Sequence, residues 1–245
     1  MVPNESMESS VGLLVLAGGF GTRLRSVVPV LPKPLAPVID RPYLYYLVNN
    51  WIQQGVTRFS FLLHHQAGLI KTFLKSSIIE NQLNHCHFRT LVEPEPLGTG
   101  GAVANAVQQY NLSGKILVTN ADTWLGTGIK QVSAGLPPAV AVVRIEDQGR
   151  YGGVRINEDK IISFEEKPGN SGAAWINAGL YQLDCELFGN WKGQPFSLES
   201  EMFPQLAKEG RLKAVKLDTD FIDIGIPEDY LRFCRWIESG KKKVL

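Results

Sequence analysis

Short apolar segments alternate with amphipathic helical segments along the first 150 residues, and this alternation constrains the fold more than any other feature. The run VGLLVLA (11–17) contains no polar side chain and ends in glycines, as strands buried on both faces do. Further strands are predicted at 59–65, 87–92, 115–119 and 139–145, with helices at 42–54, 67–76 and 100–110. We therefore predict an α/β, Rossmann-like fold with a mostly parallel, mixed central sheet and helices on both faces.

The pattern changes at about Tyr151, where strands follow one another with few helices between them. Strands are predicted at 151–156, 160–166 and 173–183, and helices at 196–210 and 227–239. We expect these strands to form an added small β layer across the mouth of the sheet. The prediction is one domain over 11–238, with a nucleotide-binding half (11–150), a substrate-binding half (151–238) and tails at 1–10 and 239–245.

Composition and charge exclude several classes of partner. The net charge is +1, so no overall field draws the chain to nucleic acid or to a membrane surface. No apolar run approaches 18 residues, and the N-terminus lacks the basic start of a signal peptide. Cys86, Cys185 and Cys234 are odd in number and widely spaced, which favours a reduced, cytoplasmic setting. The sequence leaves open whether the chain forms a homo-oligomer.

The segment LAGGFGTRLRSVVPVLPKP (16–34) follows the first predicted strand and has the composition of an anion-binding loop. It fits neither the Walker A pattern nor the dinucleotide fingerprint, which would need a third glycine at Leu24. Glycines let backbone N–H groups approach an anion, Arg23 offers a fork of donors, and Lys33 is held between two prolines. An ordinary tight turn after a strand is the simpler alternative, and the charges argue against it.

Two aspartates follow other predicted strands and suggest a cation site. Asp122 comes after KILVTNA, and Asp223 lies in FIDIGIPEDY, between a late strand and a helix. The segment EPEPLGTGG (93–101) opens another helix, where we expect free backbone N–H groups. Mg²⁺ takes few protein carboxylates and completes its shell with phosphate oxygens, so we predict Mg²⁺ on Asp122 and Asp223. Each aspartate taken singly is also compatible with a helix cap or a turn.

The order of these motifs resembles the sugar-1-phosphate nucleotidylyltransferases. G-x-G-T-R is followed by P-K-P, PLGTGGA, NAD, EEKP, INAGLY and FIDIGIPEDY, and the resemblance covers about Val11 to Ile237. Within this family, the segments EPLGTGGA, RYGGV and ISFEEKP are most similar to guanylyltransferases of D-glycero-α-D-manno-heptose 1-phosphate. The resemblance implies transfer of a nucleoside monophosphate from GTP to that sugar phosphate, giving a nucleotide sugar for surface polysaccharide.

The resemblance also implies a role for individual residues. Asp122 and Asp223 resemble the Mg²⁺ ligands, and Arg23 and Lys33 complete the expected catalytic set. Positions similar to the nucleotide-binding residues of the family are Leu16, Ala17, Gly18, Gly19, Gly21, Thr22, Arg23, Glu93, Gly98 and Thr99. Positions similar to its sugar-phosphate-binding residues are Gly152, Glu166, Lys167 and Asn177. The chain departs from the family at Ala121, where N-G-D is usual.

Other readings of the same motifs remain open at this point. They are a mannose 1-phosphate guanylyltransferase, a uridylyl- or thymidylyltransferase, a non-catalytic regulatory relative, and a dehydrogenase. A regulatory relative would be expected to lose Arg23, Lys33 or an aspartate, and all are present. His85-Cys86-His87 invites a metal-site interpretation, but strand alternation places Cys86 opposite both histidines, so we predict a structural role.

Overall fold

A computed structural model describes residues 11–76, 79, 84–146, 151–165 and 172–240 of the 245 residues. The strands are β1 (Val11–Leu16), β2 (Pro37–Val38), β3 (Arg41–Pro42), β4 (Val56–Leu63), β5 (His87–Val92), β6 (Lys115–Asn120), β7 (Thr123–Leu125), β8 (Ala139–Ile145), β9 (Gly153–Asn157), β10 (Lys160–Glu165), β11 (Ala174–Asp184), β12 (Lys213–Leu217) and β13 (Phe221–Asp223). The α-helices are α1 (Tyr43–Gln53), α2 (Ala67–Leu74), α4 (Gly98–Gln109), α5 (Ile129–Ala134), α6 (Phe203–Lys208) and α7 (Pro227–Glu238). Short helical turns lie at Thr22–Leu24, Lys33–Leu35, Cys185–Phe188 and Leu198–Met202.

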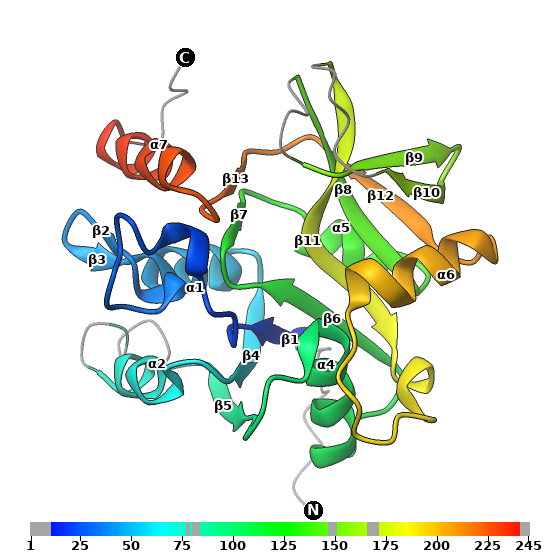
Figure 1. Ribbon diagram of the computed structural model, residues 1–245, viewed down its shortest axis with the longest axis horizontal. Coiled ribbons are helices and arrows are strands. Elements are labelled where there is room, and N and C mark those ends of the chain that lie inside the picture. The colour runs from blue at the N-terminus through cyan, green and yellow to red at the C-terminus, as the bar shows by residue number, and fades with distance from the viewer. Residues whose placement is uncertain (1–10, 77–78, 80–83, 147–150, 166–171, 241–245) are drawn as a thin grey trace, which may run out of the picture.

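The central sheet has nine strands in the order β5-β4-β1-β6-β11-β8-β12-β10-β9 (Figure 1). The strands β5, β4, β1 and β6 are parallel, and β11 then enters antiparallel between β6 and β8. The predicted mixed α/β sheet is confirmed, with its parallel part concentrated in the first half of the chain. Because parallel strands end at the same edge, the loops after β1, β4, β5 and β6 gather there.

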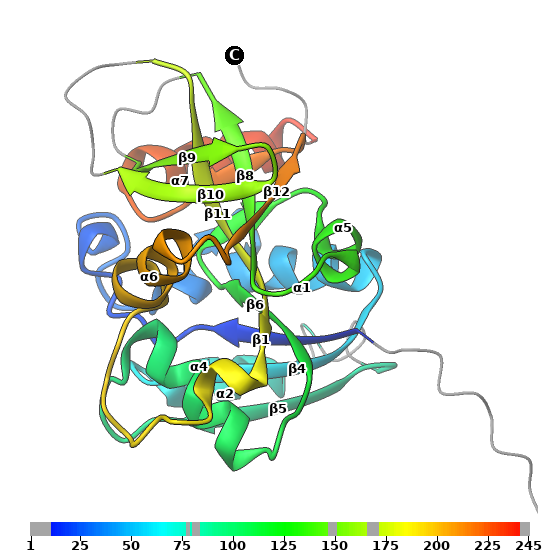
Figure 2. The same cartoon turned by 90° about the vertical axis from the view of Figure 1, so that its right-hand side faces the viewer.

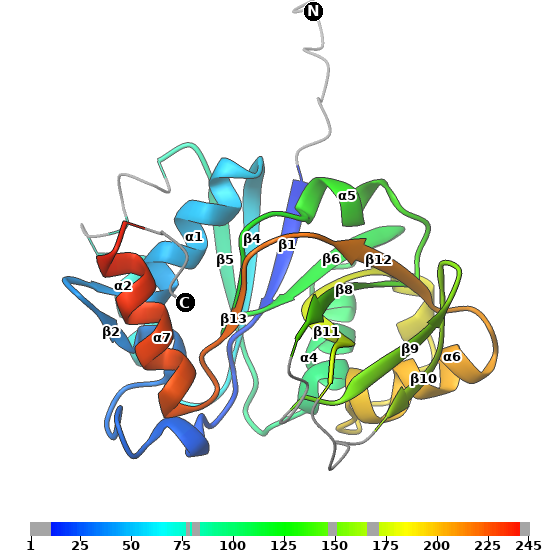
Figure 3. The ribbon, with the colours of Figure 1, turned by 90° about the horizontal axis from the view of Figure 1, so that it is seen from above.

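Helices cover both faces of the sheet, as predicted. Figure 3 shows α1, α2 and α7 on one side of β1, and α4 and α6 on the other. Each face has its own buried cluster: Leu13, Phe59 and Leu47 belong to the first, and Leu14, Val118 and Phe203 to the second. Leu13 and Leu14 are adjacent in β1, so alternation along a strand buried on both sides supplies both cores.

The strands that we expected as an added small β layer are hydrogen-bonded to the rest of the sheet. β12 pairs with β8 and β10, β10 pairs with β9, and β9 returns to β11 through Ile176 and Gly153. The strands β11, β8, β12, β10 and β9 therefore form a closed ring, whose β9–β10 hairpin lies at the top of Figure 2. The expectation missed β12, which joins the hairpin to the main sheet.

The elements that sequence patterns failed to predict are short and depend on partners far along the chain. β7 pairs with β13, the late strand expected before Asp223, across about a hundred residues, and α5, which was also not expected, has six residues. The helix expected at 196–210 begins instead as a wide turn at Leu198–Met202, capped by the Ser197 hydroxyl, before α6 starts at Phe203. Within the described part of the chain, no helix is long and apolar enough to cross a membrane.

Candidate active site

A cavity of about 330 Å³ lies at the carboxyl ends of β1, β4, β5 and β6. It is lined by most of the residues that the sequence assigned to the nucleotide, and by two of the residues assigned to catalysis. These are Leu16, Ala17, Gly18, Gly19, Glu93, Gly98 and Thr99, with Lys33 and Asp122. The edge of the sheet therefore assembles loops from four separate strands into one site, as the strand-end argument predicted.

The glycine loop lies directly against the end of β4. A Cβ at Gly18 would lie 3.0 Å from the His64 backbone nitrogen. A side chain at this position would therefore crowd the end of β4, which favours glycine. Gly21 has a φ of 60° and begins the turn at Thr22–Leu24. The Cβ of Lys33 would lie 3.4 Å from a Cβ at Gly21, so the PKP segment packs on the loop that the sequence places ahead of it.

Lys33 is mounted as its two prolines suggest, and its amino group meets a carboxylate. It opens a short turn at Lys33–Leu35. Its Nζ donates a hydrogen bond of 2.7 Å to Oδ2 of Asp122, and the Lys33 side chain is 12% exposed. In the unliganded chain, Lys33 therefore neutralises one of the two carboxylates predicted to bind a cation.

The two aspartates lie side by side, although a hundred residues separate them in sequence. β13 pairs antiparallel with β7, which sets Asp223 opposite Thr123, and the Ile224 N–H donates to the carbonyl of Asp122. Tyr43 is fully buried at the start of α1, and both aspartates act on it. Burial is the main cause that holds the pKa of its phenol well above the usual value, and the negative charges of Asp122 and Asp223 add to the shift.

The donor set at this point fits a magnesium ion. In the described ranges, no group of three or more His, Cys, Asp or Glu side chains gathers as a metal site. Two carboxylates beside a phosphate loop are nevertheless what Mg²⁺ uses when nucleotide oxygens fill the remaining positions. The residues present are therefore compatible with an ion held jointly by the protein and its nucleotide.

The segment after β5 differs from its predicted role in one respect. We expected the backbone N–H groups here to be free for a ligand. Those of Gly100 and Gly101 instead both donate to the carbonyl of Phe196. Glu93 is 7% exposed and its Oε2 accepts from the N–H of Leu97, which closes the turn before α4. Burial raises the pKa of the Glu93 carboxyl, and the hydrogen bond from Leu97 opposes this shift.

The contact between α4 and the Phe196 segment explains the glycines of PLGTGG and predicts their stability effect. A Cβ at Gly100 would lie 2.1 Å from the Phe196 ring, whereas a Cβ at Gly68, exposed in α2, would meet nothing within 4 Å. We expect Gly100→Ala to lower the unfolding free energy by about 1–3 kcal/mol through overpacking. Gly68→Ala should raise it by about 0.5–1 kcal/mol through helix propensity. Denaturant unfolding of both variants measures the difference, and equal effects would contradict the Phe196 contact.

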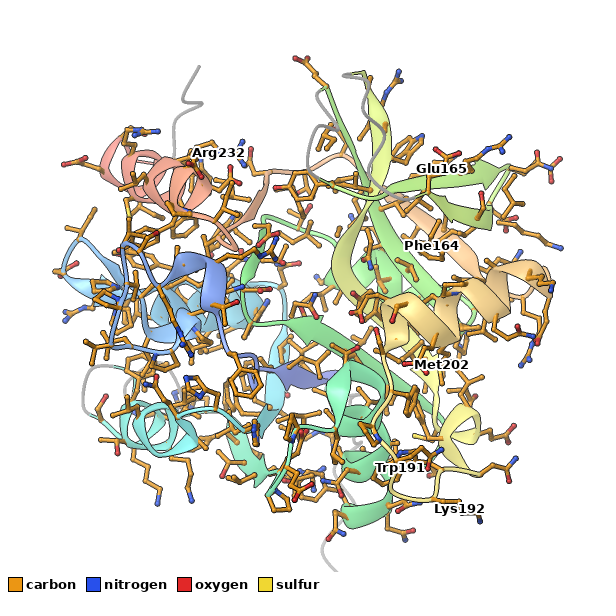
Figure 4. All side chains as sticks on the ribbon, in the orientation of Figure 1. Phe164, Glu165, Trp191, Lys192, Met202 and Arg232 are labelled. Carbon is orange, nitrogen blue, oxygen red and sulfur yellow. The ribbon has the colours of Figure 1, made fainter. Side chains whose placement is uncertain are left out.

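Two of the four residues predicted to bind the sugar phosphate, Asn177 and Gly152, lie within the described residues. The β11–β8 register shifts between Asn177 and Tyr181, and Gly179 there has a φ of 71°. A Cβ at Gly179 would lie 3.0 Å from Nδ2 of Asn120, so this bulge brings β11 beside the end of β6. Gly152 lies against the carbonyl of Glu165, which is labelled at the upper right in Figure 4. Glu166 and Lys167 lie outside the described residues.

A carboxylate that the sequence did not single out links the two sides of the site. Oε2 of Glu199 accepts from the Thr99 hydroxyl at 2.5 Å, and Oε1 accepts from the Tyr181 hydroxyl at 3.2 Å. The Asn177 amide nitrogen donates in turn to the Tyr181 oxygen at 3.1 Å. The segment that carries Glu199 follows Trp191, whose carbonyl binds Gln108 of α4 (Figure 4). No local pattern signals Glu199, because its partners lie on α4 and β11.

Several predicted residues do not line the cavity. Thr22 and Arg23 are exposed on the turn that follows the glycines, and neither they nor Gly21 are among the lining residues. His64, in the loop after β4, and Phe20, in the loop after β1, also line it. His64 Nδ1 lies 3.1 Å from the Glu93 carbonyl, and the Phe20 ring packs edge-on against the imidazole.

The departure at Ala121 is accommodated by the core. Ala121 does not adopt a positive φ, and its methyl group is 1% exposed within the first buried cluster. Its N–H donates to the carbonyl of Leu16, which ties β6 to the glycine loop. The methyl is therefore accommodated by the core, although Ala121 also contributes to the cavity lining, and the position needs no glycine in this chain.

Comparison with known proteins identifies close relatives over nearly the whole chain. The family model described as nucleotidyl transferase matches residues 13–239. D-glycero-alpha-D-manno-heptose 1-phosphate guanylyltransferase of Campylobacter jejuni is 32% identical over 223 residues, covering 90% of this chain and 97% of that protein. Mannose-1-phosphate guanylyltransferase catalytic subunit beta of Drosophila pseudoobscura pseudoobscura is 30% identical over 251 residues, which cover 98% of this chain and 66% of that protein.

Among solved structures, HddC from Yersinia pseudotuberculosis superposes with a TM-score of 0.81 and 34% identity. The match covers 93% of this chain and 99% of that chain. A second crystal structure of the same protein, complexed with GMP-PN, gives the same values. At this coverage the agreement extends over both halves of the fold.

Proposed function

Because the chain belongs to the nucleotidyl transferase family, we propose that it transfers GMP from GTP to D-glycero-α-D-manno-heptose 1-phosphate, releasing pyrophosphate. The product would be a GDP-sugar for surface polysaccharide. Since the three cysteines are odd in number and widely spaced, which favours a reduced setting, we place the enzyme in the cytoplasm. The relatives that share the chain's length support the heptose substrate, and the structure solved with GMP-PN supports a guanine nucleotide.

The observation that carries the choice of GTP is the buried carboxylate in the cavity. Guanine presents two neighbouring donors, N1–H and the N2 amino group, and a carboxylate is an acceptor for both. Uracil and thymine present one N–H between two carbonyls, which an ionised Glu93 would repel. Glu93 lines the cavity beside Gly98 and is held by the Leu97 N–H, so its position is fixed before any base arrives.

The chemistry needs charge neutralisation more than proton transfer. A sugar 1-phosphate has a second pKa of about 6, so its attacking oxygen is largely ionised at neutral pH without a general base. Positioning two polyanions is the difficulty. Lys33 in the cavity and Arg23 on the exposed turn after the glycines offer the positive charge. We propose that Asp122 and Asp223 would hold Mg²⁺. The bound ion would neutralise negative charge on the phosphate groups.

The sugar side is assigned to Asn177, Gly152, Glu166 and Lys167. The Asn177 amide is already fixed by the Gly179 N–H and the Tyr181 hydroxyl, so it presents a defined edge beside Asn120. Lys167 is the natural partner for the sugar phosphate, because a lysine is a compact point charge for an anion. We propose that the Glu199 carboxylate keeps Thr99 and Asn177 in register.

A mannose 1-phosphate guanylyltransferase is the second candidate, supported by relatives of that name at 30% identity. Both candidates share the nucleotide and the chemistry, and they differ only in the sugar. The test is a panel of GTP, ATP, UTP and dTTP crossed with heptose, mannose, glucose and N-acetylhexosamine 1-phosphates. We expect the highest kcat/KM for GTP with the heptose phosphate. A higher value for mannose 1-phosphate would replace the first candidate with the second, and a preference for UTP or dTTP would reject both.

The variant Glu93→Gln separates base recognition from stability. A buried carboxyl with a raised pKa destabilises the fold when it ionises at neutral pH, while glutamine keeps an oxygen for the Leu97 N–H. We expect unchanged or slightly higher thermal stability at pH 7, and a fall in kcat/KM for GTP of about 10–100-fold from the lost charged acceptor. Loss of stability with unaltered preference for GTP would make Glu93 a structural residue only. Glu95→Gln, an exposed carboxylate two residues away, is the matched control.

A further inference from the structure

The fold contains a second and larger cavity, of about 660 Å³, at the opposite edge of the parallel strands. It lies over the amino-terminal halves of β1, β4 and β5, on the face that α4 covers farther along. Figure 2 shows the amino-terminal end of β1 projecting beyond α4, on the right. Gly12 lines this cavity and Leu16 of the same strand lines the active-site cavity, about 13 Å away at the rise of a strand.

The lining of this cavity is strongly biased in charge. Arg58, Arg89, Lys115 and His87 contribute to it, and among the described residues that line it none is acidic. The active-site cavity, in contrast, combines Lys33 with Glu93 and Asp122. The net charge of the chain is only +1, so three cationic side chains around one cavity are a local concentration of positive charge. The concave shape strengthens the electrostatic field that a bound anion would experience.

Arg89 is an exposed residue of this cavity's lining, and two contacts fix its orientation. Its Nε donates to the Ser60 hydroxyl at 2.9 Å, and Ser60 is 7% exposed at the floor of the cavity. Its guanidinium carbon lies 3.4 Å from the centre of the Tyr110 ring, at the end of α4. The serine and the ring fix the guanidinium plane through Nε and one face, which leaves the two terminal nitrogens as a parallel pair of donors. Such a pair matches two oxygens of one phosphate.

We propose that this cavity is a binding site for the phosphate group of a small metabolite, separate from the active site. Arg89 supplies the paired donors, Arg58 and Lys115 supply charge from the neighbouring strands, and Ser113 forms the rim. A catalytic role does not account for it, because the reacting groups gather at the other edge of the sheet. β1, β4 and β6 each contribute residues to both cavities, so an occupant contacts the same strands that carry the active-site loops.

The experiment follows backbone amide signals of the full-length, isotope-labelled protein by NMR during titration with inorganic phosphate, and in a second arm with ribose 5-phosphate. We expect saturable shifts at Gly12, Ser60 and Ser113 in at least one arm. Shifts in both arms define a phosphate site, and shifts with ribose 5-phosphate alone define a site for a phosphate ester. Shifts confined to the Gly18–Gly21 loop and its neighbours, or none at all, would overturn the proposal.

Two pairs of variants test the residues. Arg89→Gln should weaken phosphate binding at this cavity about 10–100-fold, as expected for losing charge-assisted hydrogen bonds. Arg23→Gln, which removes a cation near the active site, should leave binding at this cavity unchanged.

Ser113 is exposed, so Ser113→Glu adds a negative charge at the rim without disturbing the core, and Ser113→Gln has the same shape without the charge. Binding that weakens in Ser113→Glu but not in Ser113→Gln supports the site even if Arg89→Gln does not fold. Equal binding by both would overturn it.

Discussion

Replacing Asp223 with asparagine should lower kcat about a thousandfold while leaving the fold intact. Metal-ion stabilisation of transferring phosphoryl groups is worth several kcal/mol, and about 1.4 kcal/mol corresponds to a tenfold change in rate. The asparagine side chain would keep an oxygen to accept the Gly225 N–H, which Asp223 Oδ1 now binds at 2.7 Å. The substitution therefore removes one of the two carboxylate charges proposed to hold Mg²⁺ and retains the local hydrogen bond. Initial rates of pyrophosphate release over a range of Mg²⁺ concentrations measure the loss.

Asp220→Asn is the matched control for this prediction. Asp220 is exposed on the same short segment, and its backbone carbonyl, which binds Gly126, is unaffected by the change. It should keep wild-type turnover, and both variants should melt near the wild-type temperature. If Asp223→Asn turns over near normally in saturating Mg²⁺, then Asp223 does not hold the ion and the proposed carboxylate pair fails.

The sequence predicted the parts of the site that follow from where strands end. Asp122 and Lys33 line the cavity because β6 and the loop after β1 end at one edge of a parallel sheet, a consequence of topology. The Gly18–Gly21 loop was recognisable because glycine has few other reasons to recur so closely after a buried strand. These signals are local, so one segment of sequence is enough to find each of them.

The parts that were not predicted depend on contacts between distant segments. Phe196 takes the N–H groups of Gly100 and Gly101, and Glu199 joins Thr99 to Tyr181, yet nothing near either residue in sequence reveals its partner. The way the β9–β10 hairpin joins the sheet was not predicted, because β12, with its mixed polar and apolar residues, gave no clear strand signal. A helix N-terminus that looks free in sequence can be satisfied by a chain segment a hundred residues later.

The structure also refines what Lys33 and Arg23 are expected to do. Lys33 lies in the cavity and binds Asp122, whereas Arg23 is exposed outside the cavity lining. Lys33 therefore acts as a resident cation that is in place before the nucleotide arrives. If Arg23 contacts the phosphates as proposed, we expect its turn to move toward them on binding, since catalytic contacts that are long in an unliganded enzyme often tighten in this way. The two residues should consequently affect different kinetic constants.

Arg23→Gln should lower kcat by about 10²–10³ with little change in the dissociation constant for GTP, because a donor aimed at the charge developing on pyrophosphate acts in the transition state. Arg23→Lys should recover this loss only in part, since a point charge does not reproduce the guanidinium fork. Arg25→Gln, an exposed arginine two residues further on, should have no effect and serves as the control.

Lys33→Met should weaken GTP binding as well as slow turnover, because it removes a charge present in both the ground state and the transition state. Methionine keeps an unbranched stem that packs against Gly21, where the Lys33 side chain already lies within 3.4–3.8 Å of a Cβ position. The loss therefore reports charge and not packing, and it leaves the Asp122 carboxylate without its 2.7 Å partner. Calorimetric binding of GTP and steady-state kinetics on the two variants separate the roles. If Lys33→Met binds GTP as tightly as the wild type, or Arg23→Lys keeps the wild-type kcat, the division of labour between the two cations is wrong.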